Sequence, residues 1–288
     1  DSAPLSARFE IALAPSATLW LRWRQDRPKA TGLTALVLAD PVSALTAGDA
    51  ASDRAAVFAV ATRLGPLPLA REEGRAVLRH LGRGKLLEGK NASETYLKGE
   101  GPGRYGLIHF ATHAATDDVE PERSFVLLSA GSGKEDGLLQ VREIVDLPLD
   151  GQIVVLSSCE SGSGEILRGE GVMSLARAFF QAGAHTVVAS LWPLRDDDGA
   201  ALFDRFYHHL GRGTSVAAAL QAAQSERLKD GAPAAAWAGV VVLGDGDRVP
   251  LPGGRTDLGV AAWIAGAVLL LLTAAFLVRR RSSSAPRP

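Results

Sequence analysis

Continuous apolar runs, separated by segments with helical periodicity, constrain the fold of this chain more than any other feature. Strands that are buried on both faces read as near-continuous runs of aliphatic residues, because helices cover both sides of their sheet. Such runs alternating with amphipathic helices are typical of a mainly parallel sheet with helices on both faces. The runs occupy residues 33–41, 105–113, 124–129, 152–159, 185–193 and 237–246.

Helical segments fill most of the intervals between these runs. Asp196 to Asp198 open one segment, where the helix macrodipole favours acidic groups, and Gly183 closes another. Residues 42–65 are rich in Ala and of mixed charge, and they form either a helix or a connection. The predicted helical elements, of which the third is small, cover residues 67–82, 91–99, 137–149, 170–183, 196–211 and 214–229.

The single cysteine of the chain, Cys159, ends one apolar run, and His113 ends another. In open α/β sheets, ligands bind beyond the carboxyl ends of the strands. If the two runs form neighbouring parallel strands, the thiol and the imidazole emerge on the same rim of the sheet. A thiol needs a base or an electropositive setting to become a nucleophilic thiolate. The pattern predicts a nucleophile at Cys159 with His113 as its base, and the alternative is a small buried hydrophobic residue.

The residues around Cys159 and His113 limit the kinds of site that this part of the chain can form. Backbone N–H groups near Cys159 and Gly162 lie in a Ser/Gly-rich stretch, where small residues allow close approach to an oxyanion. His109 precedes His113 by four residues, which in a strand span about 13 Å, so one metal ion cannot bind both. We therefore interpret His109 as a structural histidine and expect no metal. The glycine-rich stretches match neither a phosphate-binding loop nor a nucleophile elbow, and we expect no cofactor.

Charge and cysteine content exclude two broad classes of protein. The formal net charge of −1 gives no global basic field for binding nucleic acid. One cysteine cannot form an internal disulfide, so no disulfide framework stabilises the fold. The first residue is Asp1, and we expect the chain to be a processed or excised piece.

Residues 258–278 break the globular pattern. They form 21 consecutive residues without a charge, which as a helix span about 30 Å and match the bilayer core. A buried core helix is the alternative, but core helices rarely run so long without a polar face. The sequence therefore predicts a transmembrane helix, preceded by a Pro/Gly-rich linker at 246–257 and followed by a basic disordered tail at 279–288.

The topology of this predicted single-pass membrane protein stays open. The positive-inside rule puts the arginines at 279–281, and with them the C-terminal tail, in the cytoplasm. Residues 1–250 would then lie outside the cytoplasm, which requires an export signal. A tail-anchored arrangement would instead keep this part of the chain in the cytoplasm.

Several ordered blocks of the chain resemble the CHAT domain, a caspase-like domain found mostly in bacteria and often behind tetratricopeptide repeats. The blocks are LIHFATHAATDD, VVLSSCESGSGE, the stretch from GEGVMSLARAFF to FYHHLGRG, and the closing WAGVVVLGD. They extend over about residues 5–245, and we take residues 1–245 as the domain. The resemblance implies a caspase-like three-layer α/β/α sandwich with a mostly parallel sheet, in the group of caspases, separases and gingipains.

The family's catalytic pair falls on His113 in ATHA and on Cys159 in SSCESG. Their separation is near the roughly 50 positions typical of caspases. Ala114 stands where caspases carry Gly, and its N–H is still expected to serve the oxyanion.

The resemblance also implies a substrate pocket along the strand end SLWPLRDDD. Trp192 is expected to form one wall of the groove. Asp196 or a neighbouring residue is expected to bind a basic side chain of the substrate. Asp117 and Glu160 are further pocket candidates. For the aspartates, helix capping is the favoured alternative.

Taken together, these features predict a membrane-anchored cysteine endopeptidase. Its substrates would be proteins or peptides, and an upstream repeat domain or a partner sensor would control it. One alternative is a catalytically silent interaction or signalling scaffold at the membrane. Another is a hydrolase that uses Cys159 on a small molecule.

Overall fold

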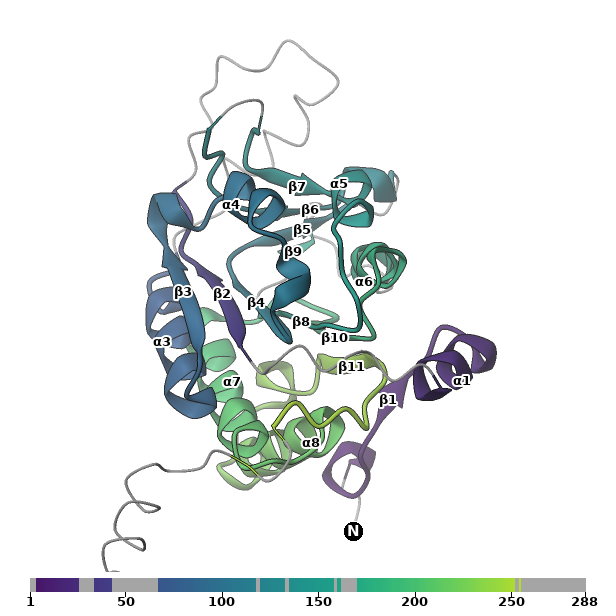
Figure 1. Cartoon of the computed structure of the whole chain (residues 1–288). Helices are drawn as coiled ribbons and strands as arrows, with labels where there is room; N and C mark the ends of the chain where they lie inside the picture. The colour runs from purple at the N-terminus through teal and green to yellow at the C-terminus, as the bar shows by residue number, and fades with distance from the viewer. Residues whose placement is uncertain are drawn as a thin grey trace, which may run out of the picture.

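The computed structural model describes residues 4–25, 34–42, 67–117, 120–132, 135–157, 160–161, 170–251 and 254. In this part of the chain the main sheet has seven strands (Figure 1). All neighbouring pairs are parallel except β10 with β11. In spatial order the strands are β1 (Ala12–Leu13), β11 (Val240–Gly244), β10 (Thr186–Ser190), β8 (Ile153–Leu156), β4 (Leu107–Ala111), β2 (Ala35–Ala39) and β3 (Gly84–Glu88).

Helices cover both faces of the main sheet, so the predicted three layers are confirmed for the described residues. One face packs against α3 (Ala70–Leu81), α7 (Asp196–Leu210) and α8 (Val216–Lys229). The other packs against α6 (Glu170–Ala182) and a second, smaller sheet. Adjacent residues of one strand serve the two cores: Val155 belongs to the α7 side and Val154 to the α6 side.

The smaller sheet has four strands within the described residues and covers the carboxyl half of the main sheet (Figure 1). Its spatial order is β7 (Leu138–Gln140), β6 (Phe125–Leu127), β5 (Ala114–Thr116) and β9 (Glu160–Ser161). Two short helices, α4 (Glu94–Gly99) and α5 (Val141–Val145), pack beside it. The sequence predicted a helical element over 137–149, and the structure corrects this: a strand comes first and the helix follows.

The local signals at the predicted helix ends act as expected. Ser93 accepts a hydrogen bond from the N–H of Tyr96, and Ser215 accepts one from Ala218. Gly183 has a φ of 111°, the left-handed conformation that stops α6. These caps explain why the predicted boundaries lie close to the observed ones.

The N-terminal elements lie at the β1 edge of the main sheet and were not predicted. Helix α1 (Ala17–Gln25) is attached through Trp23, whose ring centroid lies 4.9 Å from that of Phe180. At the same edge Gln224 donates from Nε2 to the carbonyl oxygen of Val240 at 2.8 Å. The described chain also contains short 3-10 turns at Leu5–Ala7, Gly89–Asn91, Pro102–Arg104, Pro121–Arg123 and Ala234–Ala236.

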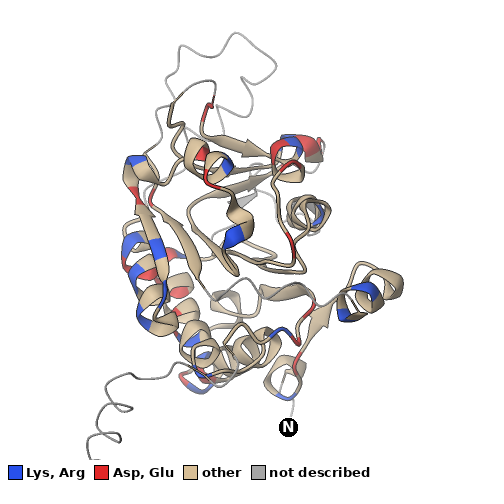
Figure 2. Cartoon of the chain, in the orientation of Figure 1, with Lys and Arg blue, Asp and Glu red and all other residues tan. Residues whose placement is uncertain are grey.

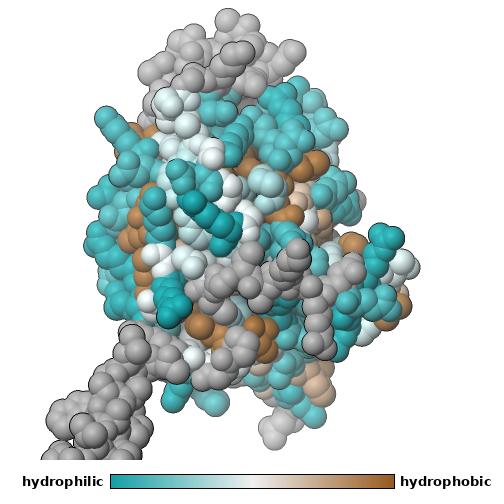
Figure 3. Space-filling model, in the orientation of Figure 1, coloured by the Kyte–Doolittle hydropathy of each residue, from teal (hydrophilic) through white to brown (hydrophobic). Residues whose placement is uncertain are grey.

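No helix among the described residues is long and apolar enough to cross a membrane. The predicted transmembrane segment 258–278 and the tail 279–288 lie outside the described residues, as do residues 43–66. Charged residues are spread over the outer helices, among them α3, α4 and α5 (Figure 2). The face shown in Figure 3 mixes hydrophilic areas with smaller hydrophobic ones.

Candidate active site

Strands β4 and β8 are parallel neighbours, which is the condition on which the predicted Cys–His pair depended. Leu107 pairs with Ile153, and Phe110 pairs with Leu156. The carboxyl ends of both strands therefore lie at the same edge of the main sheet. This edge is the rim to which the candidate site belongs.

His113 lies two residues beyond the end of β4, and only 7% of it is exposed. Its backbone is fixed on both sides by one residue of β6. The N–H of Leu127 donates to the His113 carbonyl oxygen at 2.8 Å, and Thr112 Oγ1 donates to the Leu127 carbonyl oxygen at 2.7 Å. The imidazole is therefore attached to a backbone segment that these two hydrogen bonds hold in place.

Ala114 opens β5 directly after His113 and pairs with Val126 in the antiparallel ladder. In such a ladder hydrogen-bonded and non-hydrogen-bonded pairs alternate. Because His113 and Leu127 share a hydrogen bond, Ala114 and Val126 form the non-hydrogen-bonded kind. The Ala114 N–H therefore faces away from β6, toward the β9 side.

On that side, Glu160 of β9 pairs in parallel with Ala115. Cys159, which precedes Glu160 in the sequence, and Gly162 lie outside the described residues, and of Glu160 only the backbone is described. After β8 the last described residue before Cys159 is Ser157, whose N–H donates to the Phe110 carbonyl oxygen at 3.2 Å.

Asp196 is the first residue of α7 and reaches the start of α3. Its Oδ2 accepts a hydrogen bond from the N–H of Leu69 at 2.8 Å. Burial raises the pKa of Asp196, while this hydrogen bond works to lower it. The same turn of α7 meets the rim, because a Cβ at Gly199 would lie 3.8 Å from the Ser157 carbonyl oxygen. Asp196 thus lies near the ends of the central strands.

The two following aspartates are engaged by arginines. Asp197 accepts hydrogen bonds from Nε and Nη2 of Arg195 at 3.0 Å, and Asp198 lies 2.5 Å from Arg227 Nη2. Their position in the first turn also suits the helix macrodipole. No side chain caps the start of α7, so the helix capping that the sequence favoured for the acidic run is not observed, and the partners of these aspartates are arginines and the N–H of Leu69.

Trp192 and Asp117 are both held by intramolecular contacts. The indole Nε1 of Trp192 donates to the Ala235 carbonyl oxygen at 2.9 Å, and its ring lies over Gly239. Asp117 Oδ1 accepts from the N–H of Glu120 at 2.9 Å, which closes a turn after β5. Trp192 follows β10, so it lies at the same rim as the ends of β4 and β8.

His109 is a structural histidine, as its position inside an apolar run predicted. It is fully buried; Nδ1 lies 2.9 Å from Tyr207 Oη, and Nε2 lies 2.8 Å from Glu73 Oε1. The sequence analysis did not identify Glu73 as a buried partner of His109, although the pattern of the predicted helix contains a sign of it. Glu73 lies between Leu69 and Val77 at i+4 spacing, so it interrupts the apolar stripe of the predicted helix.

A second ionic cluster lies between α4 and α5. Carboxylate oxygens of Glu94, Glu135 and Glu143 lie within 4.8 Å of one another. Lys98 Nζ sits among them, at 2.5 Å from Glu94, 2.6 Å from Glu135 and 3.2 Å from Glu143. The ammonium group already supplies the cation that three carboxylates require, so this arrangement is an ion-pair cluster.

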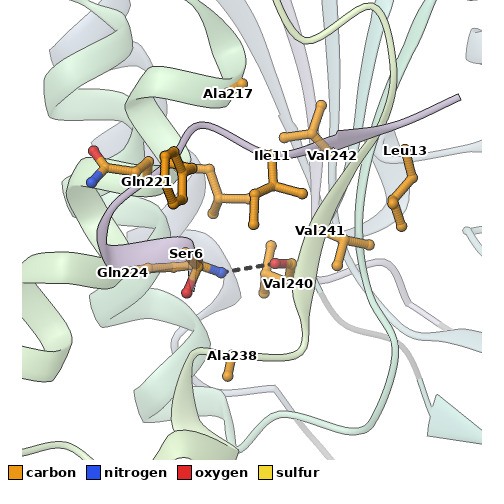
Figure 4. Close-up of a pocket in the computed structure, with 12 residues that line it drawn as sticks. Ser6, Ile11, Leu13, Ala217, Gln221, Gln224, Ala238, Val240, Val241 and Val242 are labelled. Carbon is orange, nitrogen blue, oxygen red and sulfur yellow. Dashed lines mark hydrogen bonds between the residues drawn. The ribbon is translucent and has the colours of Figure 1, made fainter. Parts of the chain in front are cut away.

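A cavity of about 140 Å³ lies between the N-terminal elements, α8 and β11. Ile11, Leu13, Val240 and Val242 are among the apolar side chains that line it (Figure 4). None of the predicted site residues contributes to its lining. It belongs to the β1 edge of the sheet and is separate from the rim that carries His113.

The model of the CHAT domain family matches residues 1–245. Among curated proteins the chain is similar to Tetratricopeptide repeat protein 28 of Homo sapiens, with 27% identity over 222 residues, and of Mus musculus, with 31% identity over 117 residues. The alignments cover 65% and 40% of this chain, but only 9% of the human and 5% of the mouse protein. The chain thus spans less than a tenth of these relatives.

Two solved structures show weaker similarity. One is the separase–securin complex of Saccharomyces cerevisiae, with a TM-score of 0.42, 14% identity, and coverage of 83% of this chain and 14% of that chain. The other is the Arg specific cysteine proteinase gingipain R, with a TM-score of 0.43, 13% identity, and coverage of 81% of this chain and 52% of that chain. Scores at this level add nothing to the fold that the strand order defines.

Proposed function

The chain belongs to the CHAT domain family, and on this premise we propose that it is a cysteine endopeptidase with Cys159 as nucleophile and His113 as general base. The observation that carries the proposal is the register of the two central strands. Phe110 pairs with Leu156, and counting three residues onward along each chain reaches His113 on one side and Cys159 on the other.

The proposed reaction needs no group beyond those of the chain and water. His113 takes the proton of the Cys159 thiol, and the thiolate attacks the carbonyl carbon of a peptide bond. The amine leaves with the proton from the imidazolium, and a thioester forms. Water then attacks the thioester, which releases the acid product and restores the thiol.

Backbone N–H groups are proposed to stabilise the oxyanion in both steps. Ala114 is the best-supported donor, because its N–H faces the strand that follows Cys159. The N–H groups of Cys159 and Gly162 complete the proposed set. Removal of one such donor typically slows catalysis by about 100-fold or more.

The proposed substrate groove runs along the rim past Trp192 and Asp196. The carboxylate of Asp196 would meet a basic side chain of the substrate, with Asp117 and Glu160 as further contributors. In the structure Asp196 accepts the N–H of Leu69, and a carboxylate has room for a further donor on its other oxygen. The groove would therefore use Asp196 without breaking its contact to α3.

The curated relatives are named for tetratricopeptide repeats, and we propose that a repeat-containing segment or partner controls the site. Membrane attachment through residues 258–278 is a separate proposal, supported by the length and apolar character of that segment. Extraction of membranes with carbonate tests it. The full chain should stay in the pellet, whereas a chain ending at residue 257 should be released.

Labelling with a peptidyl electrophile tests the peptidase proposal. Because the chain has one cysteine, each labelled molecule identifies Cys159 by mass. The wild type should react much faster with the peptidyl reagent than with a small alkylating agent. Cys159→Ala should not react, and His113→Ala should react roughly 100-fold more slowly. His208→Gln, at a histidine near the end of α7, is the matched control and should react like the wild type.

The outcome that favours the alternative is equally clear. If the wild type reacts with the peptidyl reagent no faster than with the small alkylating agent, with its repeat partner present, the domain is an interaction or signalling module. A small-molecule hydrolase would instead show fast acylation by a small ester and no preference for a peptide.

A further inference from the structure

The amino ends of the central strands form a second edge of the main sheet, opposite the rim that carries His113, and we call it the amino edge. β11 runs antiparallel to β10, so Gly244 at its end pairs with Thr186 at the start of β10. Helix α7 follows the carboxyl end of β10 and returns the chain to the amino edge, where α8 begins. There the N–H of Ala217 donates to the Gly246 carbonyl oxygen at 3.0 Å.

Exposed apolar side chains gather at the amino edge and along the neighbouring strand β1. Nine large apolar side chains stand out as exposed in the described part of the chain, and seven of them lie within residues 5–21 or at Val249. The exposed fraction is 38% for Trp20 and 50% for Leu21, both on α1. Single exposed apolar residues are ordinary, but a group on one side of a molecule marks a binding surface.

Helix α1 is attached to the amino edge through Trp23 and Arg24. The Trp23 ring centroid lies 5.8 Å from that of His185, the residue before β10. Arg24 forms an ion pair with Asp247, which follows the end of β11. Leu21 is about 200° from Trp23 around the helix, so its side chain points away from the domain.

The composition of α1 suits the surface of a lipid bilayer. Tryptophan rings are enriched at the level of the headgroups, and arginine covers apolar surface with its stem while its charge stays in water. Arg24 Cζ lies 4.9 Å from the centroid of the Trp20 ring, and Arg22 is exposed on the same helix. Helices that combine Trp and Leu with Arg bind at the boundary between headgroups and acyl chains.

The described chain ends at the same edge. A Cβ at Gly213, in the turn between α7 and α8, would lie 2.7 Å from the backbone nitrogen of Gly254, the last described residue. Four residues of chain reach at most about 14 Å, so the apolar segment 258–278 begins within that reach of Gly254. A bilayer that this segment enters therefore has to lie against the amino edge.

We propose that the amino edge rests on a bilayer surface, with Trp20 and Leu21 at the headgroup boundary and the rim of His113 facing away from the membrane. This orientation rests on the proposed attachment through residues 258–278. The five residues of β10 span about 17 Å, so the rim stands off from the lipid by about this length. The proposed peptidase would therefore take soluble segments of proteins and not membrane-embedded ones.

Fluorescence quenching of the full chain in vesicles of phosphatidylcholine and phosphatidylglycerol tests the orientation. A polarity-sensitive dye is attached to Leu21→Cys in the Cys159→Ala background. Leu228→Cys in the same background is the matched control, because Leu228 is exposed and lies about 18 Å along α8 from Val216, toward the rim. Nitroxide lipids should quench the dye at residue 21 several-fold more than the dye at residue 228, and iodide should show the reverse order. Wild type labelled at Cys159 should behave like the control.

Two results would contradict the contact with the bilayer. One is a dye at residue 21 that iodide quenches as strongly as the dye at residue 228. The other is a dye at residue 21 that is shielded from both iodide and nitroxide lipids, which would place a protein on α1. Shielding that grows with the ratio of protein to lipid would identify a second copy of the chain. Should Leu21→Cys fail to fold, Trp20→Cys places the dye on the same helix, and the same order of quenching is expected.

Flotation of the carbonate-treated vesicles separates this inference from the attachment on which it rests. A full chain that does not float with the lipid has no membrane anchor, which ends both proposals. A chain that floats but leaves residue 21 open to iodide ends only the orientation. Neither result depends on peptidase activity.

Discussion

The indole ring of Trp192 lies directly over Gly239, so closely that a Cβ at residue 239 would come within 2.5 Å of the ring. The contact fixes a large aromatic side chain at the rim where β10 ends. The hydrogen bond from Trp192 to the Ala235 carbonyl oxygen holds the same ring from its polar end. Trp192 therefore has a defined position that one added methyl group at Gly239 should disturb.

We expect Gly239→Ala to displace the indole and to break its hydrogen bond to Ala235. The emission maximum of tryptophan fluorescence should shift, and the shift should disappear when Trp192→Phe is added. If the ring walls the substrate groove, KM for a peptide substrate should rise several-fold while labelling by a small alkylating agent stays unchanged. An emission spectrum identical to that of the wild type would show that the indole has not moved.

The cluster around Lys98 predicts how stability depends on pH. Burial, and then the contact with Glu135, raise the pKa of Glu94 to about 7 from an ordinary value of 4.5, although Lys98 works to lower it. The folded chain therefore binds this proton more tightly than the unfolded chain does. Between about pH 4.5 and pH 7 the unfolded state loses the proton first, so stability falls as pH rises, by on the order of 3 kcal/mol.

The carboxyl group of Glu135, which contacts Glu94, affects stability in a different pH range. The hydrogen bond with Glu94, and then Lys98, lower the pKa of Glu135, so its contribution is lost only below the range in which Glu94 titrates. Glu94→Gln should flatten the dependence of the urea midpoint on pH between pH 5 and pH 7. Glu122→Gln, at an exposed position, should keep the wild-type slope. An equal slope in Glu94→Gln and wild type would contradict the assignment.

Gly183 should be among the glycines least tolerant of substitution. Its φ is 111°, and a Cβ there would lie 2.1 Å from the Leu149 carbonyl oxygen. Gly183→Ala should lower the free energy of unfolding by roughly 2–4 kcal/mol, measured by urea denaturation. At Gly99, in the last turn of α4, a Cβ would meet nothing within 4 Å. Gly99→Ala is the control, and it should be neutral or stabilise by about 0.5 kcal/mol.

Thr112→Val removes the hydroxyl that anchors the chain beside His113. The buried hydrogen bond from Thr112 Oγ1 to the Leu127 carbonyl oxygen is 2.7 Å long, and its loss should cost about 1–2 kcal/mol of unfolding free energy. Labelling of Cys159 should slow, because His113 follows directly in the sequence. A destabilised variant with wild-type labelling kinetics would show that the anchor serves the fold alone.

The sequence predicted the central strands and the long helices because each carries a strong local signal. The apolar runs of β2, β4, β8 and β10 are continuous, and the periodicity of α3 is clear between Leu69 and Leu81. Caps at Ser93 and Ser215 and the stop at Gly183 then set the boundaries. Such signals lie within a few residues of each other, so one sequence suffices to read them.

Four of the shortest strands were missed because their pairing, and not their composition, defines them. β1 and β9 have two residues each, and β5 and β7 have three. The antiparallel direction of β11 likewise depends on where α7 and α8 return the chain. Neither the pairing of a short strand nor the direction of β11 leaves a local pattern in the sequence.

The rim was predicted correctly where it depended on strand neighbours, since β4 and β8 are parallel and adjacent. The distance between Cys159 and His113 stays a prediction. Glu73 was missed because a single acid in an apolar stripe resembles ordinary helix composition. Its partner His109, in the next layer, is what shows the acid to be buried and paired.

The side chain of Gln224 has a consequence for the protein in concentrated solution. Exposed strand edges recruit strands from other molecules through unpaired backbone groups, which is a common route to aggregation. The short β1 pairs only with Val242 and Leu243 of β11, so β11 lies at the edge of the sheet at Val240. There the Val240 carbonyl oxygen accepts a hydrogen bond from the side-chain amide of Gln224. Because the Gln224 amide already occupies this acceptor, a strand from another molecule could not pair with the Val240 carbonyl oxygen without displacing that amide.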